Sequence, residues 1–509
     1  MRTTHRPTDH AGPRLTDYLV LGVAAGHWPL GVMARNHWQV VHPERIIALV
    51  LVVGLLAGLV ALFLTRVGVR RLTATFVVFL ATIMFMRGGQ ILRDFEDPLA
   101  WLIVGLPVLL AAVVSTRFGD HLAIRVTLVA LTVTLASGPL ISLYLSLQEP
   151  GLSQVLNSQV GDVEIVKRPN VFLVVFDGYP GLQALEREFG QTKEELISEL
   201  RERGFQVPES AWTSYWSTEL ALPSILQMTY PVEEGSLNSM TRQHLHQIIG
   251  GDSQLVEILE SNGYETVMVE SGWTGSSCGE AFDRCVVSPW LDDQLFYILW
   301  EGVTGESVLA SNGHAYTKST QATMSRLRTL VVDTYDTVVP TFVFAHLIAP
   351  HGPFYLSNSC QTVVSGERFG DRFYVAGVDR ATRDRFFFDH MQCVDGFMKE
   401  LADSVKPGDV VILLADHGTG RRESQLDGGV QDWAAVIERM NVFAAVRMDQ
   451  ACDLGDSFVT PNLMRRVLSC YAKDPVEDTP SRIFLPGMRE LASDDVARLL
   501  DLDVTLLGQ

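Results

Sequence analysis

Residues 170–177 read NVFLVVFD, a continuous run of β-branched and aromatic residues that ends in an aspartate. A run that is apolar at every position predicts a strand buried on both faces, as in a parallel sheet. Strand-like runs and helix-like segments then alternate along the chain: strands at 265–269, 341–345, 409–415 and 441–447, and helices at 192–203, 254–262, 318–332 and 386–404. This alternation predicts an α/β domain with a mostly parallel central sheet covered by helices.

The first 147 residues have a different character and predict an α-helical transmembrane bundle. A membrane-spanning helix needs ~20 mostly apolar residues, and residues 46–64 meet this without a single charge. Further candidate spans lie at 18–33, 72–86, 99–114 and 126–147, which gives four clear spans and, with the weaker 18–33, a fifth. The loop 66–71 holds three Arg and no acid, so we expect it on the cytoplasmic side. This topology places everything after about residue 147 outside the cytoplasm.

The net charge of −19 over 509 residues is unevenly divided. Residues 1–150 hold 12 Arg, no Lys and 8 acidic residues, so the excess of acid lies in the remainder. An acidic chain lacks the Lys and Arg that phosphate backbones require, which argues against nucleic acid as a partner. We expect a transmembrane domain over 1–147, a linker over 148–168, a catalytic domain over 169–470 and a C-terminal tail over 471–509.

All six cysteines lie in the part of the chain that is expected outside the cytoplasm. An even number of cysteines in an exported domain favours disulfides. We expect neighbours in the sequence to pair, as Cys278–Cys285, Cys360–Cys393 and Cys452–Cys470. The alternative is a set of free buried thiols.

Polar residues at the predicted strand ends carry the candidate chemistry. Asp177 ends the first strand, and Asp416 and His417 end another in VVILLADHG. His351 follows a third strand in HLIAPHGPF. Ligands of open α/β sheets gather at the carboxyl ends of the strands, so these residues should converge. Two Asp and a His form a nitrogen and oxygen donor set for one divalent metal, Zn²⁺ or Mn²⁺.

A nucleophilic hydroxyl is expected at the start of the amphipathic segment 219–228. A hydroxyl there lies beside free backbone N–H groups, which suit a phosphoryl or sulfuryl group. A metal would lower the pKa of this hydroxyl and activate it for attack. Thr218 is the first candidate, with Ser217 and Thr213 as alternatives. Thr218 could instead serve only as a helix N-cap.

Taken in order, RPNVFLVVFDGY, STELALPSILQM, HLIAPHGPF and VVILLADHG resemble the sulfatase/alkaline-phosphatase superfamily over roughly residues 169–450. Membrane spans followed by such a domain resemble lipoteichoic acid synthases and phosphoethanolamine transferases. The resemblance implies an alkaline-phosphatase-like fold with four metal ligands: Asp177, Thr218, Asp416 and His417. It also implies that Thr218 is the nucleophile. His351 then matches the histidine that contacts the phosphoryl group or assists the leaving group.

The chain departs from parts of this superfamily. Leu220 and Leu222 stand where formylglycine sulfatases have Pro and Arg, which argues against a formylglycine nucleophile. No histidine follows His417, and Gly178 rather than an acid follows Asp177. Members that use two metals need such extra ligands, so we expect one metal.

Arg421 and Arg422 stand downstream of the Asp-His-Gly motif, where related transferases often have another histidine. Either Arg could bind an anionic substrate group as a fork, or both could be solvated surface residues. The sequence thus predicts a metal-dependent phosphoryl-group transferase, of phosphoglycerol or phosphoethanolamine type, anchored in the bacterial inner membrane. Its substrate would be a lipid or an envelope glycan. A sulfatase-like phosphoester or sulfoester hydrolase and a non-catalytic envelope scaffold are the alternatives.

Overall fold

A computed structural model describes residues 14–35, 43–94, 129–135, 137, 141, 161–233, 239–271, 274–286, 313–352, 354–363, 379–422, 426 and 432–501. The described residues belong to two compact units. The first comprises helices within residues 1–150, and the second comprises the described residues from 161 on.

The first unit contains three helices that pack against one another: α1 (Leu15–Arg35), α2 (Pro43–Arg66) and α3 (Arg71–Asp94). Within α2, Ile47–Arg66 has a mean hydropathy of 3.1 and is, in the described part of the chain, the one helix long and apolar enough to cross a membrane. Leu51 and Phe63 on α2 are 66% and 64% exposed, so the helix presents an apolar surface outward. The expected span at 99–114 and most of that at 126–147 lie outside the described residues.

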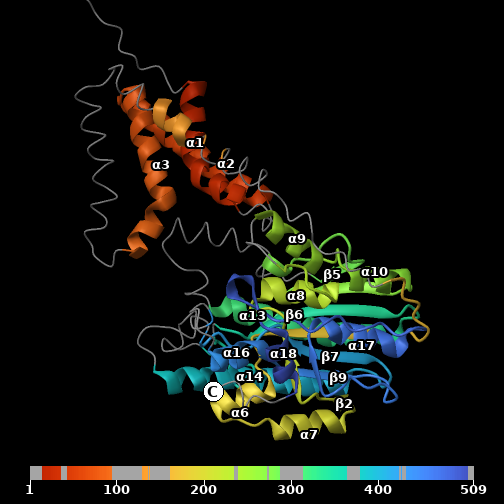
Figure 1. The fold of residues 1–509 in the computed structure, drawn as a ribbon. Coiled ribbons are helices and arrows are strands. Elements are labelled where there is room, and N and C mark those ends of the chain that lie inside the picture. The colour runs from red at the N-terminus through yellow and green to blue at the C-terminus, as the bar shows by residue number, and fades with distance from the viewer. Residues whose placement is uncertain are drawn as a thin grey trace, which may run out of the picture. The chain divides into compact units, whose positions relative to one another are not determined.

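The second unit is built on a seven-stranded sheet of order β2-β9-β7-β1-β6-β4-β5 (Figure 1). The strands are β1 (Val171–Asp177), β2 (Phe205–Gln206), β4 (Glu265–Val269), β5 (Arg284–Val286), β6 (Thr341–Pro350), β7 (Val410–Ala415) and β9 (Ala444–Arg447). The five strands from β7 to β5 are parallel, whereas β9 is antiparallel to β7 and β2 to β9. The prediction of a mostly parallel sheet is confirmed.

Strand β1 lies in the middle of this sheet and explains why its sequence is apolar throughout. Every residue of β1 is buried. Val174 pairs with Ala345 of β6 on one side and with Leu413 of β7 on the other. A strand with two neighbours and helices over its faces has no surface for polar side chains, until Asp177 at its carboxyl end.

The helices of this unit alternate with the strands along the chain. They are α6 (Leu182–Phe189), α7 (Glu194–Glu202), α8 (Thr218–Gln227), α9 (Ser239–Ile249), α10 (Gln254–Ser261), α13 (Gly313–Asp333), α14 (Arg380–Ser404), α16 (Trp433–Met440), α17 (Pro461–Tyr471) and α18 (Ser493–Leu500). Helices α13 and α14 pack against β6 and each other, while α8 packs against α9, α10 and α17. The segment predicted as a helix at 219–228 is therefore α8, which begins at Thr218.

The strand expected at 441–447 is divided in the structure. Its first part, β8 (Asn441–Val442), pairs with β3 (Ser210–Trp212) in a second sheet, and its last part is β9. Phe443 lies between them, buried, with its ring centroid 5.0 Å from that of Tyr179. One apolar run therefore supplies strands to both sheets.

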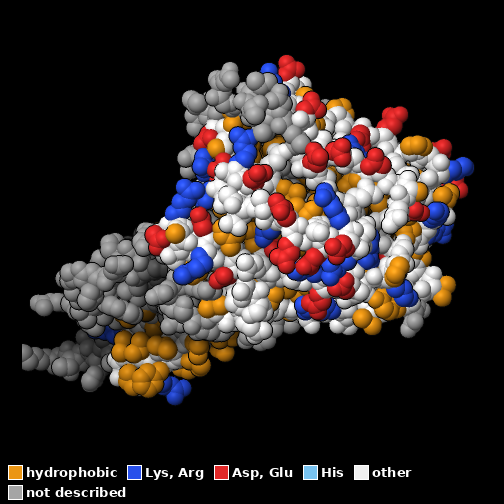
Figure 2. Space-filling model, turned by 90° about the horizontal axis from the view of Figure 1, so that it is seen from below, with side chains coloured by type: hydrophobic (Ala, Val, Ile, Leu, Met, Phe, Trp, Pro, Cys, Tyr) orange, Lys and Arg blue, Asp and Glu red, His pale blue; other side chains and the backbone are white. Residues whose placement is uncertain are grey.

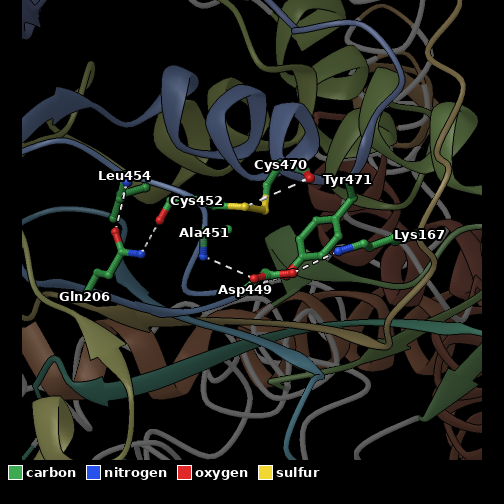
Figure 3. Close-up of a disulfide and its surroundings, with 8 residues drawn as sticks. All are labelled: Lys167, Gln206, Asp449, Ala451, Cys452, Leu454, Cys470 and Tyr471. Carbon is green, nitrogen blue, oxygen red and sulfur yellow. Dashed lines mark hydrogen bonds and ion pairs between the residues drawn. A yellow bond between two sulfur atoms is a disulfide. The ribbon is translucent and has the colours of Figure 1, made fainter.

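The described cysteines form the three disulfides expected from the sequence: Cys278–Cys285, Cys360–Cys393 and Cys452–Cys470. The last of these joins the loop after β9 to α17 (Figure 3). Beside it, Lys167 forms an ion pair with Asp449 at 3.1 Å, and the Asp449 N–H donates to the Tyr471 hydroxyl at 2.9 Å. The beginning of the α/β unit is thus tied to its C-terminal part.

The surface of the α/β unit mixes both signs of charge. Figure 2 shows Asp and Glu side chains gathered beside Lys and Arg on the face seen from below. Pairs such as Arg203–Asp403 (2.7 Å) and Arg328–Glu400 (2.6 Å) occur on the exposed surface. Exposed pairs of this kind contribute about 0–1 kcal/mol each to the free energy of unfolding.

Candidate active site

Two aspartates meet at the carboxyl ends of the neighbouring strands β1 and β7. Asp177 is the last residue of β1, and Asp416 directly follows β7, where Ala415 is paired with Phe176. Asp416 Oδ1 accepts hydrogen bonds from the backbone N–H groups of Gly178 at 3.1 Å and His417 at 2.7 Å. The sheet register itself therefore places both carboxylates side by side.

The hydroxyl of Thr218 reaches the same place from the start of α8. Ser217 is the N-cap residue, and Thr218 Oγ1 lies 3.0 Å from His417 Nε2. His417 Nδ1 lies 2.9 Å from the Gly418 carbonyl oxygen, to which it donates. This bond fixes the tautomer in which Nε2 carries the lone pair. His417 Nε2 is also 3.4 Å from Asp177 Oδ1 and 3.5 Å from Asp416 Oδ2.

The two alternative hydroxyls have other surroundings. The Thr213 hydroxyl donates to the Tyr215 carbonyl at 3.1 Å, and the Tyr215 N–H donates back to it at 3.4 Å. Thr213 thus stabilises a local turn. Ser217 makes no side-chain capping bond to α8.

His346 is a fifth member of this group that the sequence analysis missed. It lies within β6 and is fully buried. Its Nε2 is 4.0 Å from Asp177 Oδ2 and 3.9 Å from Asp416 Oδ2. Asp177, His346 and Asp416 offer ligand atoms that all lie within 4.8 Å of one another. The sequence did contain a signal for His346, a histidine within the apolar stretch HLIAP. The strand was expected to end at residue 345, but β6 continues to Pro350. We call Asp177, Thr218, His346, Asp416 and His417 the strand-end cluster.

His351 lies at the rim of the strand-end cluster. Its backbone N–H donates to the Asp177 carbonyl at 2.9 Å, and its Nδ1 lies 2.6 Å from the Gly352 carbonyl oxygen. Its ring centroid is 6.3 Å from that of His417. Because His351 is exposed whereas His417 is buried, it can meet a molecule that approaches from solvent.

Burial shifts the ionisation of the whole strand-end cluster. It raises the pKa of Asp177 to about 7, and burial together with the charge of Asp177 raises the pKa of Asp416 to about 8. The positive charge of Arg439 opposes both shifts. Burial lowers the pKa of His346 to about 3 and that of His417 well below its usual value. Both histidines are therefore neutral, which is the form that ligates metals.

The strand-end cluster fits a divalent cation. Asp177 Oδ1 and Asp416 Oδ2 are buried and accept no hydrogen bond from the described residues. A buried acceptor without a partner is costly, and a cation would satisfy both. Ligand atoms about 2.0–2.1 Å from a tetrahedral Zn²⁺ lie about 3.3 Å apart. The separations of His417 Nε2 from Thr218, Asp177 and Asp416 oxygens are 3.0, 3.4 and 3.5 Å.

Only a glycine fits at the third position of the Asp-His-Gly motif. A Cβ on Gly418 would lie 2.0 Å from the Glu438 carbonyl oxygen, because the end of α16 approaches the backbone there. The Gly418 N–H donates to the Arg439 carbonyl at 2.7 Å. Arg439, 6% exposed, is a second residue that the sequence analysis missed. Its contacts are to backbone more than 20 residues away, for which no local sequence pattern exists.

Arg421 and Arg422 lie in a separate group with three acids, which we call the carboxylate–arginine cluster. Arg421 forms ion pairs with Asp384 (3.4 Å), Glu438 (3.5 Å) and Glu188 (3.8 Å). Arg422 pairs with Glu188 (2.9 Å) and Glu438 (3.6 Å). The Arg421 side chain is 9% exposed and that of Arg422 31%. In the described residues, the structure gives neither guanidinium a contact with the strand-end cluster.

The fold is similar to several solved structures. They include the integral membrane protein lipooligosaccharide phosphoethanolamine transferase A from Neisseria meningitidis (13% identity, 90% of this chain and 95% of that chain, TM-score 0.40). The C-terminal periplasmic domain of EcEptC from Escherichia coli, in complex with Zn, is 12% identical over 64% of this chain and 89% of that chain, with a TM-score of 0.39. A protein of a glycosaminoglycan-metabolism locus of Bacteroides thetaiotaomicron is 15% identical over 59% and 72%, with a TM-score of 0.36.

A family model gives the assignment. No curated protein matches the chain, but the Sulfatase family model matches residues 169–442. This match covers more than half of the chain and includes every member of the strand-end cluster. The chain belongs to the sulfatase family, in the sulfatase/alkaline-phosphatase superfamily, and is an enzyme that acts on phosphoesters or sulfoesters.

Proposed function

We propose that this enzyme is a metal-dependent phosphoryl-group transferase of the cell envelope with Thr218 as its nucleophile. One observation carries the proposal: Thr218 Oγ1 lies 3.0 Å from His417 Nε2, in a cluster with two buried carboxylate oxygens that accept no hydrogen bond from the described residues. A hydroxyl at a helix start, beside donors for an anion and carboxylates for a cation, suits attack on a phosphorus atom.

The proposed ligands of one divalent metal are Asp177, Asp416 and His417 together with Thr218. The nitrogen and oxygen donors favour Zn²⁺, with Mn²⁺ as the alternative. When bound, such an ion lowers the pKa of a hydroxyl and stabilises negative charge on phosphoryl oxygens. Neutral His417 and the two carboxylates would hold it, and His346 stands behind the carboxylates as a further nitrogen donor.

The transfer would proceed in two displacements at phosphorus. In the first, Thr218 Oγ loses its proton to solvent and forms a bond to phosphorus as the bond to the donor alcohol breaks. The exposed His351 at the rim would protonate the leaving alcohol and then regain a proton from solvent. In the second, an acceptor hydroxyl attacks the phosphothreonine, transfers its own proton to the Thr218 oxygen and restores the hydroxyl. Water as acceptor would make the same site a hydrolase.

The substrate would be a lipid or an envelope glycan, met at a bilayer surface. The apolar helix α2 supports a membrane anchor, and the three disulfides support an oxidising compartment. The Neisseria protein named above is an integral membrane protein, a lipooligosaccharide phosphoethanolamine transferase. We place the enzyme in the bacterial inner membrane, with several spans in residues 1–147, a linker over 148–168 and catalysis outside the cytoplasm over 169–470.

The experiment compares Thr218→Ala with Ser217→Ala in the full-length protein purified in detergent. Each is incubated with Zn²⁺ and vesicles of phosphatidylethanolamine and phosphatidylglycerol, and intact mass with peptide mapping is recorded. We expect a phosphoryl adduct on Thr218 in wild type and Ser217→Ala, and none in Thr218→Ala with its Zn²⁺ retained. An adduct that survives in Thr218→Ala, or moves to Ser217, contradicts the proposed nucleophile.

A further inference from the structure

One buried arginine joins the two backbone segments that carry Thr218 and His417. Arg439 Nε donates to the Trp216 carbonyl at 2.6 Å, and Arg439 Nη1 donates to the Gly418 carbonyl at 3.1 Å. Trp216 precedes Thr218 by two residues, and Gly418 directly follows His417. A single planar guanidinium therefore spans the two segments whose side chains meet at 3.0 Å.

The backbone around Arg439 is held at the same junction. The Arg439 carbonyl accepts from the Gly418 N–H at 2.7 Å, and the carbonyl of the next residue, Met440, accepts from the Thr213 N–H at 2.8 Å. The end of α16 thus bonds to both segments through its backbone as well. Because the backbone of Glu438 and Arg439 approaches Gly418 too closely for any Cβ there, the end of α16 is held tightly at this junction.

The contacts of Arg439 are unusual for a buried cation. Buried guanidinium groups are ordinarily paired with carboxylates, but no described carboxylate lies within 4.0 Å of this one. Its N–H groups donate to backbone carbonyls. Its charge interacts with Asp177 and Asp416 only at longer range. Hydrogen bonds from a charged donor are roughly twice as strong as neutral ones. Such bonds hold two loops at a set distance rather than neutralise a charge.

We propose that Arg439 is a positioning residue for the transfer reaction, because its guanidinium sets the distance between the Thr218 hydroxyl and His417. The inference rests on the proposed role of Thr218 as nucleophile. Misplacing a reacting group by about 1 Å can cost about a hundredfold in rate. A lysine keeps the charge but has no planar fork to reach both carbonyls, so Arg439→Lys isolates the geometric role.

The chain offers a matched control in Arg465, which is 8% exposed. Arg465 also donates to two backbone carbonyls, those of Met228 at 2.7 Å and Glu477 at 2.8 Å. Met228 is the C-cap residue of α8, so this arginine holds the far end of the helix that Thr218 begins. Arg465→Lys therefore makes the same chemical change at the other end of the same helix.

The experiment measures turnover of bis(p-nitrophenyl) phosphate, bound Zn²⁺ and the thermal unfolding midpoint for the full-length enzyme and both variants. We expect Arg439→Lys to lower kcat about a hundredfold, with KM and Zn²⁺ content close to wild type. Arg465→Lys should shift the unfolding midpoint by a similar amount and leave kcat close to wild type. Arg439→Gln, which can donate to only one carbonyl at a time, should lower kcat as strongly and serves if the lysine variant does not fold.

Two results would overturn the inference. One is an equal loss of kcat in Arg439→Lys and Arg465→Lys, which would mean general loosening of the domain. The other is a normal kcat per Zn²⁺-loaded molecule in Arg439→Lys or Arg439→Gln. Failure of the proposed function has a different signature, since full turnover in Thr218→Ala would refute the nucleophile whatever the arginine variants do.

Discussion

The described residues of the α/β unit include two clusters of buried charge, and the clusters differ in whether their carboxylates are paired with arginine. In the carboxylate–arginine cluster, Glu188, Asp384 and Glu438 are all within ion-pair distance of Arg421. In the strand-end cluster, the described residues offer Asp177 and Asp416 neutral histidines but no cation within ion-pair distance. The first group pairs each of its carboxylates with an arginine, so that even Glu438 Oε2, which accepts no hydrogen bond from the described residues, has cations at 3.5 and 3.6 Å. The second leaves two carboxylate oxygens with neither a hydrogen bond nor a cation among the described residues within 4.0 Å.

The difference separates a cluster of internally paired charges from the cluster that we propose to be functional. A buried ion-pair network holds elements together, and breaking it by removing one partner costs stability. A buried pair of like charges is instead a cost to the fold that a cation from outside can relieve. The two clusters should therefore respond in opposite ways when a charge is removed.

The largest effect is expected for Asp416→Asn, which removes a carboxylate from the strand-end cluster. We expect at least a hundredfold weaker Zn²⁺ binding, on the order of the loss known for disturbed metal sites, and no measurable turnover of bis(p-nitrophenyl) phosphate. The fold should persist, because one of two repelling buried charges is gone. Zn²⁺ affinity by chelator competition is the measurement, with Glu188→Gln as the control that keeps it. Wild-type affinity in Asp416→Asn would place the metal elsewhere.

A smaller effect is expected for Arg421→Met, and it concerns the free energy of unfolding rather than Zn²⁺ binding. It removes one ion-pair partner from each of three carboxylates, of which Glu188 and Glu438 keep Arg422. It should destabilise the protein by about 3 kcal/mol, with Zn²⁺ content and turnover of the folded fraction retained. Thermal unfolding and metal analysis of the same samples test this. If stability stays unchanged while KM rises, Arg421 binds substrate, which is one of the two roles that its position in the sequence left open.

The smallest effect is a pH dependence of the metal-free protein. Because burial raises the pKa values of Asp177 and Asp416 to about 7 and about 8, the folded state binds more protons than the unfolded state above pH 4. Its free energy of unfolding should fall as pH rises from about 6.5 to 8, by up to about 1 kcal/mol per pH unit for each carboxyl. The buried histidines oppose this only below about pH 6.5.

Unfolding midpoints measured with EDTA across this range, in wild type and Asp416→Asn, test the pH dependence. The variant has one titrating carboxyl fewer, so its slope should be flatter. Added Zn²⁺ should reverse the trend in wild type, since it binds the deprotonated carboxylates. A wild-type slope equal to that of Asp416→Asn would mean that Asp416 stays ionised without metal.

The sequence predicted the features that depend on local pattern. The strand that ends at Asp177 and the strand before Asp416 were expected from their apolar runs, and α8 was expected from its amphipathic spacing. Placement of Asp177, Asp416 and His417 together then followed from the geometry of parallel strands. The roles assigned to these residues stay predictions that the experiments above test.

Features that depend on distant contacts could not be foreseen. Arg439 acquires its neighbours because α16 ends against Gly418, a contact without any sequence signature. His346 lies in a strand that continues to Pro350, past the point where the apolar run was expected to end. The apolar run at 441–447 contributes to two sheets, with Phe443 packed against Tyr179 between them. An apolar run alone does not indicate such a division.

The three disulfides close loops of 7, 33 and 18 residues in chain order, and none encloses part of another. In the proposed topology, each bridge can therefore form as soon as its second cysteine emerges from the membrane, without waiting for later segments. The last to emerge, Cys470, secures the region that Lys167 and Asp449 hold against the first residues of the unit. The bridges would thus form in the order in which the chain is synthesised, and the last one would secure the contact between the end of the α/β unit and its first residues.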